Sequence, residues 1–185
     1  MSATLAEQLL MYFLLPLWIA VGFGDWLCHR RTDIEHTAGP KESFIHLLML
    51  AEVGLPLLAA LFLEVNALII GLMVVAFLIH EATALWDVNY AVSQREVGPW
   101  EQHLHSFLEM IPLMAILLVS VLHPGQFLAL FNLGGEAARF DLTPKAPPVP
   151  LGYLIALFVA IALFSVLPYL NELYRGLRAR RAKAL

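Results

Sequence analysis

The sequence has few charged residues and a single cysteine. Charged side chains make up 14% of the 185 residues, against about 25% in an ordinary soluble domain. Cys28 is alone, which excludes an internal disulfide and any cysteine-rich zinc or iron–sulfur site. Lysine and arginine do not occur at all within the apolar runs at 6–28, 43–63, 66–88 and 103–123. A carboxylate in these runs therefore has no basic residue within the runs to pair with.

Several known motifs are also absent. The HxxxH and HxxHH boxes of integral-membrane desaturases and hydroxylases do not occur, and only His103-x-His105 comes near them. The HEATA segment at 80–84 is not the HExxH zinc-protease motif, because position 84 is Ala. No Lys or Arg precedes the first apolar run and no small-residue cleavage site follows it, so we expect this run to stay as a helix.

Apolar residues dominate the chain and are grouped into long blocks. They make up 60% of the sequence, and each block reaches the roughly 20 residues that a helix needs to cross a bilayer. The blocks are 6–28, 43–63, 66–88, 103–123 and 150–170. We predict an all-α integral membrane protein: a four-transmembrane-helix bundle carrying a buried metal site, plus a fifth, peripheral transmembrane helix. The expected organisation is the bundle at 1–123, an extracytoplasmic loop at 124–149, and the fifth helix with a basic tail at 150–185.

The basic residues predict the orientation in the membrane. Of the eleven lysines and arginines, only Arg139 and Lys145 lie in the 124–149 connection; the others lie in 28–42, 89–102 and the tail after 170. By the positive-inside rule the C-terminus is cytoplasmic and the N-terminus outside, as five crossings require. We expect a bacterial inner-membrane protein whose tail lies against anionic lipid headgroups, and no binding to nucleic acid.

Carboxylates and imidazoles gather in the cytoplasmic half of the first four helices. Of the seven histidines, only His123 falls on the other side. The candidate metal ligands of this layer are Asp25, His29, Glu42, His46, Glu52, His80, Glu81, Asp87, His105 and Glu109. Residues at its edge are His103, His36 and Glu35.

The spacing of these residues puts a carboxylate and an imidazole on one face of each helix. Asp25/His29, Glu42/His46 and His105/Glu109 are separated by four residues, about one turn, and His80 and Asp87 are two turns apart. Glu52 and Glu81 are either further ligands or residues that orient histidines. Glu52 lies off the Glu42/His46 face by helical-wheel geometry.

Ordinary ion pairs at the membrane surface explain only part of this layer. They are the favoured interpretation for Glu35, Glu96 and Glu101, which lie in loops or at helix ends. They do not explain deeper residues such as Glu52, His80 and Glu109, because a charge at that depth costs on the order of 3 kcal/mol even on a lenient scale. Protons or metal ions must compensate, and carboxylate and imidazole ligands without thiolates suit iron, manganese or zinc.

This ligand inventory resembles that of membrane-embedded di-metal proteins of the diiron type, over residues 20–112. Soluble bundles of that type take a carboxylate from each helix and carboxylate–histidine pairs from two of them. The resemblance implies two metal ions, with iron expected first and manganese or zinc as alternatives. It also implies an oxidoreductase that activates dioxygen or peroxide on a lipid-soluble substrate.

Three other functions remain open on the sequence. A zinc-dependent membrane hydrolase needs the same ligand types, and a proton or metal-ion transporter also needs intramembrane carboxylates and histidines. A haem protein would use facing histidines such as His46 and His80, but the surplus of carboxylates argues against it. The electron donor is not readable from the sequence, and the fifth helix permits a homodimer without requiring one.

Overall fold

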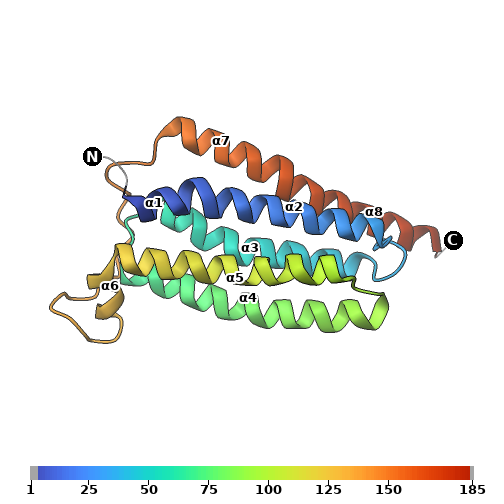
Figure 1. Ribbon diagram of the computed structural model, residues 1–185, viewed down its shortest axis with the longest axis horizontal. Helices are drawn as coiled ribbons and strands as arrows, with labels where there is room; N and C mark the ends of the chain where they lie inside the picture. Colours follow the sequence, from blue (N-terminus) through green and yellow to red (C-terminus); the bar gives the residue numbers. More distant parts are fainter. Residues whose placement is uncertain (1–3, 184–185) are drawn as a thin grey trace.

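The computed structural model describes residues 4–183 and is built from helices that run along one long axis (Figure 1). The first long helix comprises α1 (Leu5–Leu9), η1 (Leu10–Leu14) and α2 (Leu15–Arg31). It is followed by α3 (Pro40–Phe62), α4 (Ala67–Gln94), α5 (Pro99–Leu122) and the short α6 (Pro124–Ala129). The last long helix comprises α7 (Leu151–Ile161), η2 (Ala162–Val166) and α8 (Leu167–Lys183).

Five of these helical segments are long and apolar enough to cross a membrane, as predicted. The molecule is thus consistent with a helical membrane protein. The helices run further than expected at the end of the bundle where the C-terminus lies, and the fifth continues to Lys183. Its 33 residues correspond to about 50 Å of helix, against a hydrocarbon core of about 30 Å. The basic part of α8 therefore extends beyond the apolar layer.

Prolines account for the widened turns of the first and fifth helices. The π-helical segments η1 and η2 each precede a proline, Pro16 and Pro168. A proline ring clashes with the carbonyl four residues earlier and has no N–H to donate, so the helix opens locally to a wider turn. Both helices continue after the proline, and buried residues such as Trp18 and Tyr169 follow it closely.

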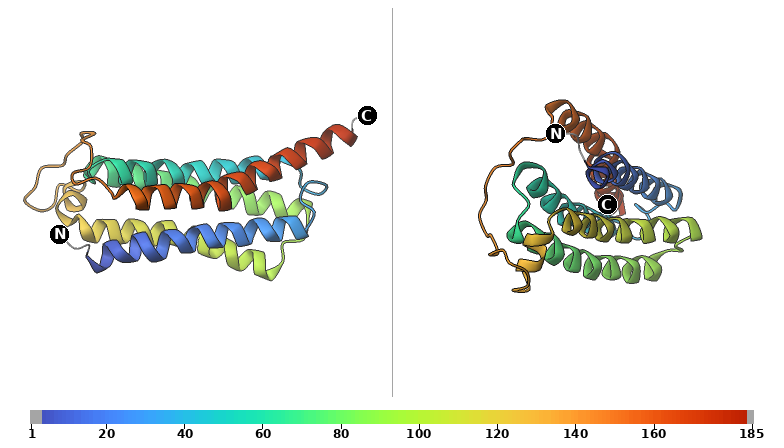
Figure 2. Two further views of the ribbon diagram at one scale, coloured as in Figure 1. Left: turned by 90° about the horizontal axis from the view of Figure 1, so that it is seen from above. Right: turned by 60° about the vertical axis from the view of Figure 1, so that its left-hand side comes forward.

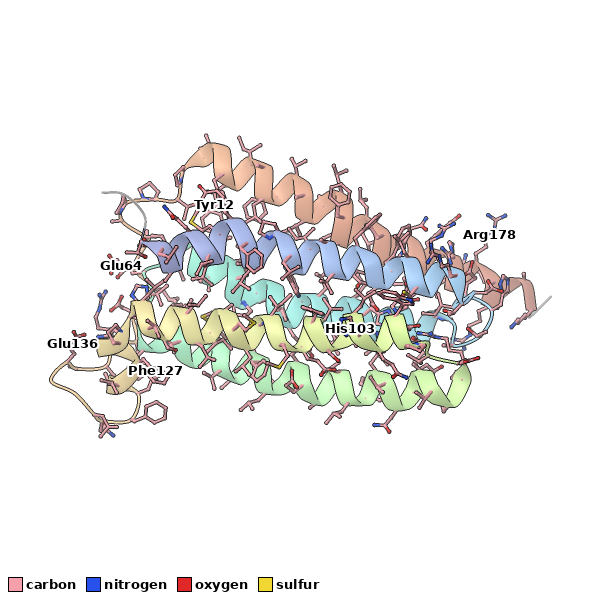
Figure 3. The ribbon with its side chains drawn as sticks, viewed as in Figure 1. Tyr12, Glu64, His103, Phe127, Glu136 and Arg178 are labelled. Carbon is pink, nitrogen blue, oxygen red and sulfur yellow. The ribbon has the colours of Figure 1, made fainter. Side chains whose placement is uncertain are left out.

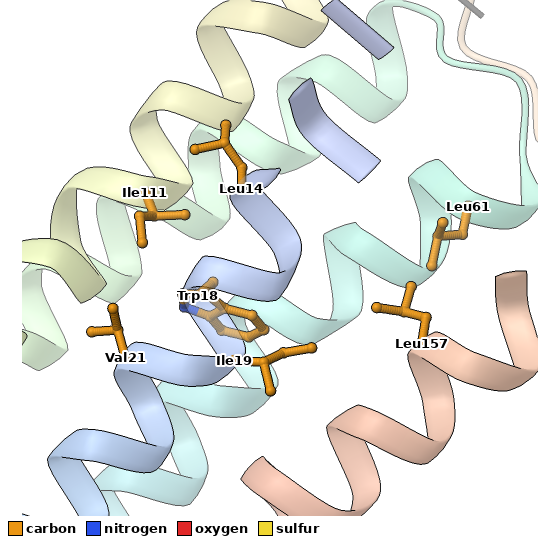
Figure 4. Packing of buried hydrophobic residues seen from close by; sticks show 7 residues of the cluster. All are labelled: Leu14, Trp18, Ile19, Val21, Leu61, Ile111 and Leu157. Atoms are coloured by element: carbon orange, nitrogen blue, oxygen red, sulfur yellow. The ribbon is translucent and has the colours of Figure 1, made fainter. Parts of the chain in front are cut away.

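Apolar packing holds the helices together in the half of the bundle nearest the N-terminus of the chain. A buried cluster joins the first helix to α3, α5 and α7 (Figure 4), and consists of Leu14, Trp18, Ile19, Val21, Leu61, Ile111 and Leu157. Many other large apolar side chains point outward, such as Leu78 and Val121, which are 62% and 71% exposed. Outward-facing apolar side chains are what a lipid environment requires.

The 124–149 connection is tied to the turn between α3 and α4. Asn66 donates to the backbone oxygen of Asp141 at 2.8 Å, and Arg139 pairs with both Glu64 and Asp141 at 3.0 Å. The hydrogen bond from Arg139 lowers the pKa of Asp141 to about 2. Glu64 and Glu136 mark this end of the molecule in Figure 3. The long connection thus lies over the N-terminal end of the bundle.

The fifth helix differs from the prediction of a peripheral addition. Its α8 part packs against α3 and α2 towards the C-terminal end (Figure 2). Tyr169, Glu172 and Gly176 are spaced three and four residues apart, share one face of α8, and are all buried. Because the helix does not stop at residue 170, it brings a carboxylate into the interior of the bundle.

Gly176 allows the close approach of α8 to α3, which generates a first prediction. A Cβ atom at this position would lie 3.0 Å from the Cα and N atoms of Pro40, and backbone atoms cannot move aside easily. We expect Gly176→Ala to lower the melting temperature in detergent, with a cost of about 1–3 kcal/mol typical of overpacking.

Gly54→Ala is the matched control, because a Cβ there meets nothing within 4 Å. Since glycine inside a helix is destabilising by about 1 kcal/mol relative to alanine, this variant should melt at or above the wild-type temperature. A Gly176→Ala protein as stable as Gly54→Ala would contradict the close packing of α8.

Candidate metal centre

Ionisable side chains from five helical segments meet in the half of the bundle nearest the C-terminus. Seven of them are buried: Asp25, His29, Glu42, His46, Asp87, Glu101 and Glu172. His105 lies beside them and is only 12% exposed at its side chain. The i,i+4 spacing explains why Asp25 and His29 project together from α2, and Glu42 and His46 from α3.

Glu172 holds two histidines in parallel. Its carboxylate oxygens lie 3.0 Å from His29 Nδ1 and 2.9 Å from His46 Nδ1. The two rings stack with centroids 4.4 Å apart and planes inclined by 12°. A carboxylate only accepts hydrogen bonds, so each Nδ1 carries the proton that it donates. The two Nε2 atoms therefore point together, away from Glu172.

The Nε2 atoms face a second set of carboxylates. His29 Nε2 lies 3.3 Å from Asp25 and 3.4 Å from Glu101. His46 Nε2 lies 3.3 Å from Asp87 and 3.9 Å from Glu42.

His105 completes the side of the cluster around Asp25. Its Nε2 atom is 3.0 Å from Asp25 Oδ1. The side chains around His29 Nε2 therefore come from α2 and α5, and those around His46 Nε2 come from α3 and α4.

Arg95 closes the cluster at the C-terminal end. It leaves the short connection between α4 and α5, and its guanidinium bonds both Glu42, at 2.5 Å, and Glu101. Burial by itself lowers the pKa of Arg95, but hydrogen bonds to Glu101 and Glu42 outweigh this effect and raise the pKa above its usual value. Glu101, expected in a helix-end ion pair, does pair with Arg95 but is buried and also faces His29.

The charges in this cluster do not balance. With neutral imidazoles, the five carboxylates of Asp25, Glu42, Asp87, Glu101 and Glu172 face only the single guanidinium of Arg95. Four negative charges are then left, and burying even one unpaired charge is costly. Additional protons or bound cations must supply the missing positive charge.

Several buried atoms in this cluster lack a hydrogen-bond partner. They are the Nε2 atoms of His29 and His46, Asp25 Oδ1 and Asp87 Oδ1, each of which lies at ion-pair distance from another residue of the cluster but not in hydrogen-bond geometry. Unpartnered buried polar atoms are rare in folded proteins and point to a ligand or ion. Their types, imidazole nitrogen and carboxylate oxygen, are those that bind iron, manganese and zinc.

The donors form two groups whose ligand atoms all lie within 4.8 Å of one another. One group is Asp25, His29, Glu101 and His105, and the other is His29, Glu42 and His46. A third group of Asp33, Glu35 and His36 lies at the surface of the 28–42 connection. Glu35 is paired with Arg175, and the side chains of His36 and Asp33 are more than half exposed. The buried groups thus fit a metal centre better.

The remaining predicted residues lie elsewhere. Glu52 faces α4, where it accepts a hydrogen bond from Thr83 at 2.8 Å and lies 3.6 Å from His80. Glu81 and Glu109 are half-buried, and Glu109 borders the same cavity as His80 and Asp87. His103 is exposed on α5 (Figure 3). Within residues 4–183, none of Glu52, His80, Glu81 and Glu109 belongs to a group of three mutually close ligand atoms. Asp87 is not in such a group either, but it lies in the buried cluster, 3.3 Å from His46 Nε2.

Sequence reasoning missed Glu172 and Arg95. Glu172 lies two residues beyond the predicted end of the fifth apolar run, and Arg95 lies in a connection. A helix that continues past 170 puts Tyr169, Glu172 and Gly176 on one face. Asn171 and Gly176 are, however, residue types at which helices often end, so the sequence does not signal this continuation. No sequence signal distinguishes Arg95 from a basic residue at the membrane surface.

The bridge made by Glu172 generates a second prediction. Glu172→Ala leaves two buried Nδ1 donors unpaired, and each unsatisfied group costs about 1–3 kcal/mol, so the melting temperature in detergent should fall clearly. Glu172→Gln keeps one acceptor oxygen and should lie between Glu172→Ala and wild type.

The control for this pair is Asn171→Ala, an exposed neighbour on the same helix. It should melt within a degree or two of wild type, because surface substitutions change the stability by about 0.5 kcal/mol or less. Equal melting temperatures for Glu172→Ala and Asn171→Ala would show that Glu172 does not hold the histidines.

Comparison with known proteins does not assign the chain to a family. No protein-family model, no curated protein and no solved structure matches the chain. The chemistry of the buried cluster therefore has to follow from its own residues.

Proposed function

We propose that the buried cluster binds two iron ions and that the protein is a membrane-bound diiron-type oxidoreductase acting on a lipid-soluble substrate. The observation that carries this proposal is the pair of stacked histidines. Both Nδ1 atoms are bound by Glu172, and both Nε2 atoms are buried and face carboxylates at 3.3 Å without forming a hydrogen bond. Metal-ligating histidines ordinarily give their other ring N–H to a carboxylate in this way.

The residues divide into two metal positions. The first would be bound by the close group of Asp25, His29, His105 and Glu101. The second would be bound by His46 and Glu42 of the other close group, together with Asp87, which lies 3.3 Å from His46 Nε2. Metal ions in dinuclear sites lie about 3.5–4 Å apart, which is compatible with two imidazoles whose centroids are 4.4 Å apart. Two divalent ions would also supply the four positive charges that the cluster lacks.

The surrounding residues would prepare this site. Glu172 fixes the orientation and the tautomer of both histidines, and Arg95 holds the carboxylates of Glu42 and Glu101 in place. Tyr169 donates a hydrogen bond to the backbone oxygen of Gly22 at 3.1 Å and closes the side next to Asp25. Bound iron would supply the electrons for activating dioxygen or peroxide, while the helices exclude water.

Iron is favoured over zinc by the number of donors. Zinc sites usually have four ligands, of which three come from the protein in a catalytic site. This cluster offers seven side chains to two positions, four of them carboxylates, with no thiolate. Such an oxygen-rich set resembles that of carboxylate-bridged di-iron and di-manganese bundles. A zinc-dependent hydrolase remains the alternative outcome of the metal analysis.

Metal analysis of the detergent-purified protein, with an optical spectrum, tests this proposal. We expect about two irons per chain in the wild type and a loss of at least half of the iron in His46→Ala. His103→Ala should retain all of it, because His103 is an exposed histidine outside the buried cluster. Zinc alone in the wild type would favour the hydrolase, and a wild type without metal would contradict the proposal.

The orientation in the membrane is part of the same proposal. The basic residues favour a cytoplasmic C-terminus, which places the metal centre in the cytoplasmic half. In a Cys28→Ser background, a membrane-impermeant maleimide should label Gly135→Cys from outside intact cells and Ala182→Cys only in inverted vesicles. Both positions are exposed. The reverse labelling pattern would contradict this orientation.

A further inference from the structure

A small cavity lies between the metal-centre residues and His80. Its volume is about 50 Å³. Asp25, His46, Asp87 and His105 border it on the side of the cluster, and His80 also lines it. Apolar side chains such as Leu50 and Leu108 form other parts of the wall. One water needs roughly 10–15 Å³ of such a cavity, so the space admits a molecule of only a few heavy atoms.

His80 is a buried polar side chain in this wall that lacks a close side-chain hydrogen bond. It is 3% exposed, and its nearest polar neighbours are the Glu52 carboxylate, 3.6 Å from Nδ1, and the backbone of Met49. It is also separate from the buried groups that could bind a metal ion. A buried imidazole without a close side-chain hydrogen bond favours a polar molecule beside it, because leaving its polar atoms unsatisfied costs free energy.

The Glu52 carboxylate, held by Thr83, favours one tautomer of His80. The Glu52 carboxylate lies 3.6 Å from His80 Nδ1, and Thr83 Oγ1 donates to its other oxygen at 2.8 Å. Neither Glu52 nor Thr83 borders the cavity, whereas His80 does. A carboxylate beside Nδ1 favours the tautomer that carries its proton there. Nε2 is then left as a hydrogen-bond acceptor for a molecule in the cavity.

We propose that this cavity binds a small peroxide, of the hydrogen peroxide class, whose O–H group donates to His80 Nε2. The inference rests on the proposed function and selects peroxide over dioxygen as the oxidant. Peroxide has an O–H at each end, so one end meets His80 while the other faces Asp25, His46 and Asp87. Dioxygen has about the same size but no proton to donate, and a lipid-sized substrate does not fit the volume.

Hydroxylamine is the probe, because it has two heavy atoms and an O–H donor like hydrogen peroxide. We use zinc-substituted protein, whose metal does not change oxidation state, and measure binding by calorimetry. His80→Leu should weaken hydroxylamine binding about tenfold, the effect of one buried hydrogen bond. Met49→Leu, a change of similar volume in the same wall, should leave the affinity unchanged.

Azide tests whether the bound molecule must donate a hydrogen bond to His80, because the azide anion has no proton to donate. Its affinity should change less than about twofold in His80→Leu, well below the tenfold effect of one hydrogen bond. An equal loss for azide and hydroxylamine, or an unchanged hydroxylamine affinity in His80→Leu, would overturn the inference. A wild type that binds neither zinc nor iron would instead contradict the proposed function.

Nitrogen NMR of the wild-type protein tests the same inference without relying on a correctly folded His80→Leu variant. With ¹⁵N-labelled histidine, the His80 Nε2 resonance should move when hydroxylamine is added, while that of the exposed His103 stays unchanged. A His80 resonance that does not respond to saturating hydroxylamine would overturn the inference even if His80→Leu could not be purified.

Discussion

The carboxylate of Glu172 is the contact on which the rest of the buried cluster depends. It binds the Nδ1 atoms of His29 and His46 at 3.0 and 2.9 Å, and so turns two side chains from different helices into a parallel pair. Without this bridge each ring could rotate about its side-chain bonds, and the direction of Nε2 would not be fixed. With it, both Nε2 atoms face the carboxylates of α2, α3, α4 and α5. The geometry of the whole site thus depends on the register of α8.

The register of α8 is set by contacts that lie outside the buried cluster. Apolar packing around Trp18 and Leu157 joins the first and fifth helices at the N-terminal end, and the close contact of Gly176 with Pro40 positions α8 at the other end. The π-helical turn before Pro168 lies between these two anchors. The fifth helix is therefore a structural part of the site, and a chain that lost it would lose the bridge between the histidines.

Much of the fold could be predicted from the sequence, because five apolar runs of bilayer length leave few alternatives. The local pairs Asp25/His29 and Glu42/His46 could also be predicted, since i,i+4 spacing fixes them within one helix. Contacts between helices could not. Glu52 lies off the Glu42/His46 face and pairs with His80 of α4, which divides the predicted layer into a cluster and a separate histidine. Glu172 and Arg95 enter the site only through tertiary packing, and neither spacing nor hydropathy encodes that packing.

Our central proposal is that the stacked histidines present their Nε2 atoms to two metal ions. Anomalous X-ray diffraction from crystals of iron-loaded protein, collected at the iron absorption edge, tests this proposal most directly. We expect two anomalous peaks inside the bundle, one beside His29 Nε2 and the other beside His46 Nε2. A single peak at the surface group of Asp33, Glu35 and His36, or crystals of iron-loaded protein with no peak near either imidazole, would contradict it.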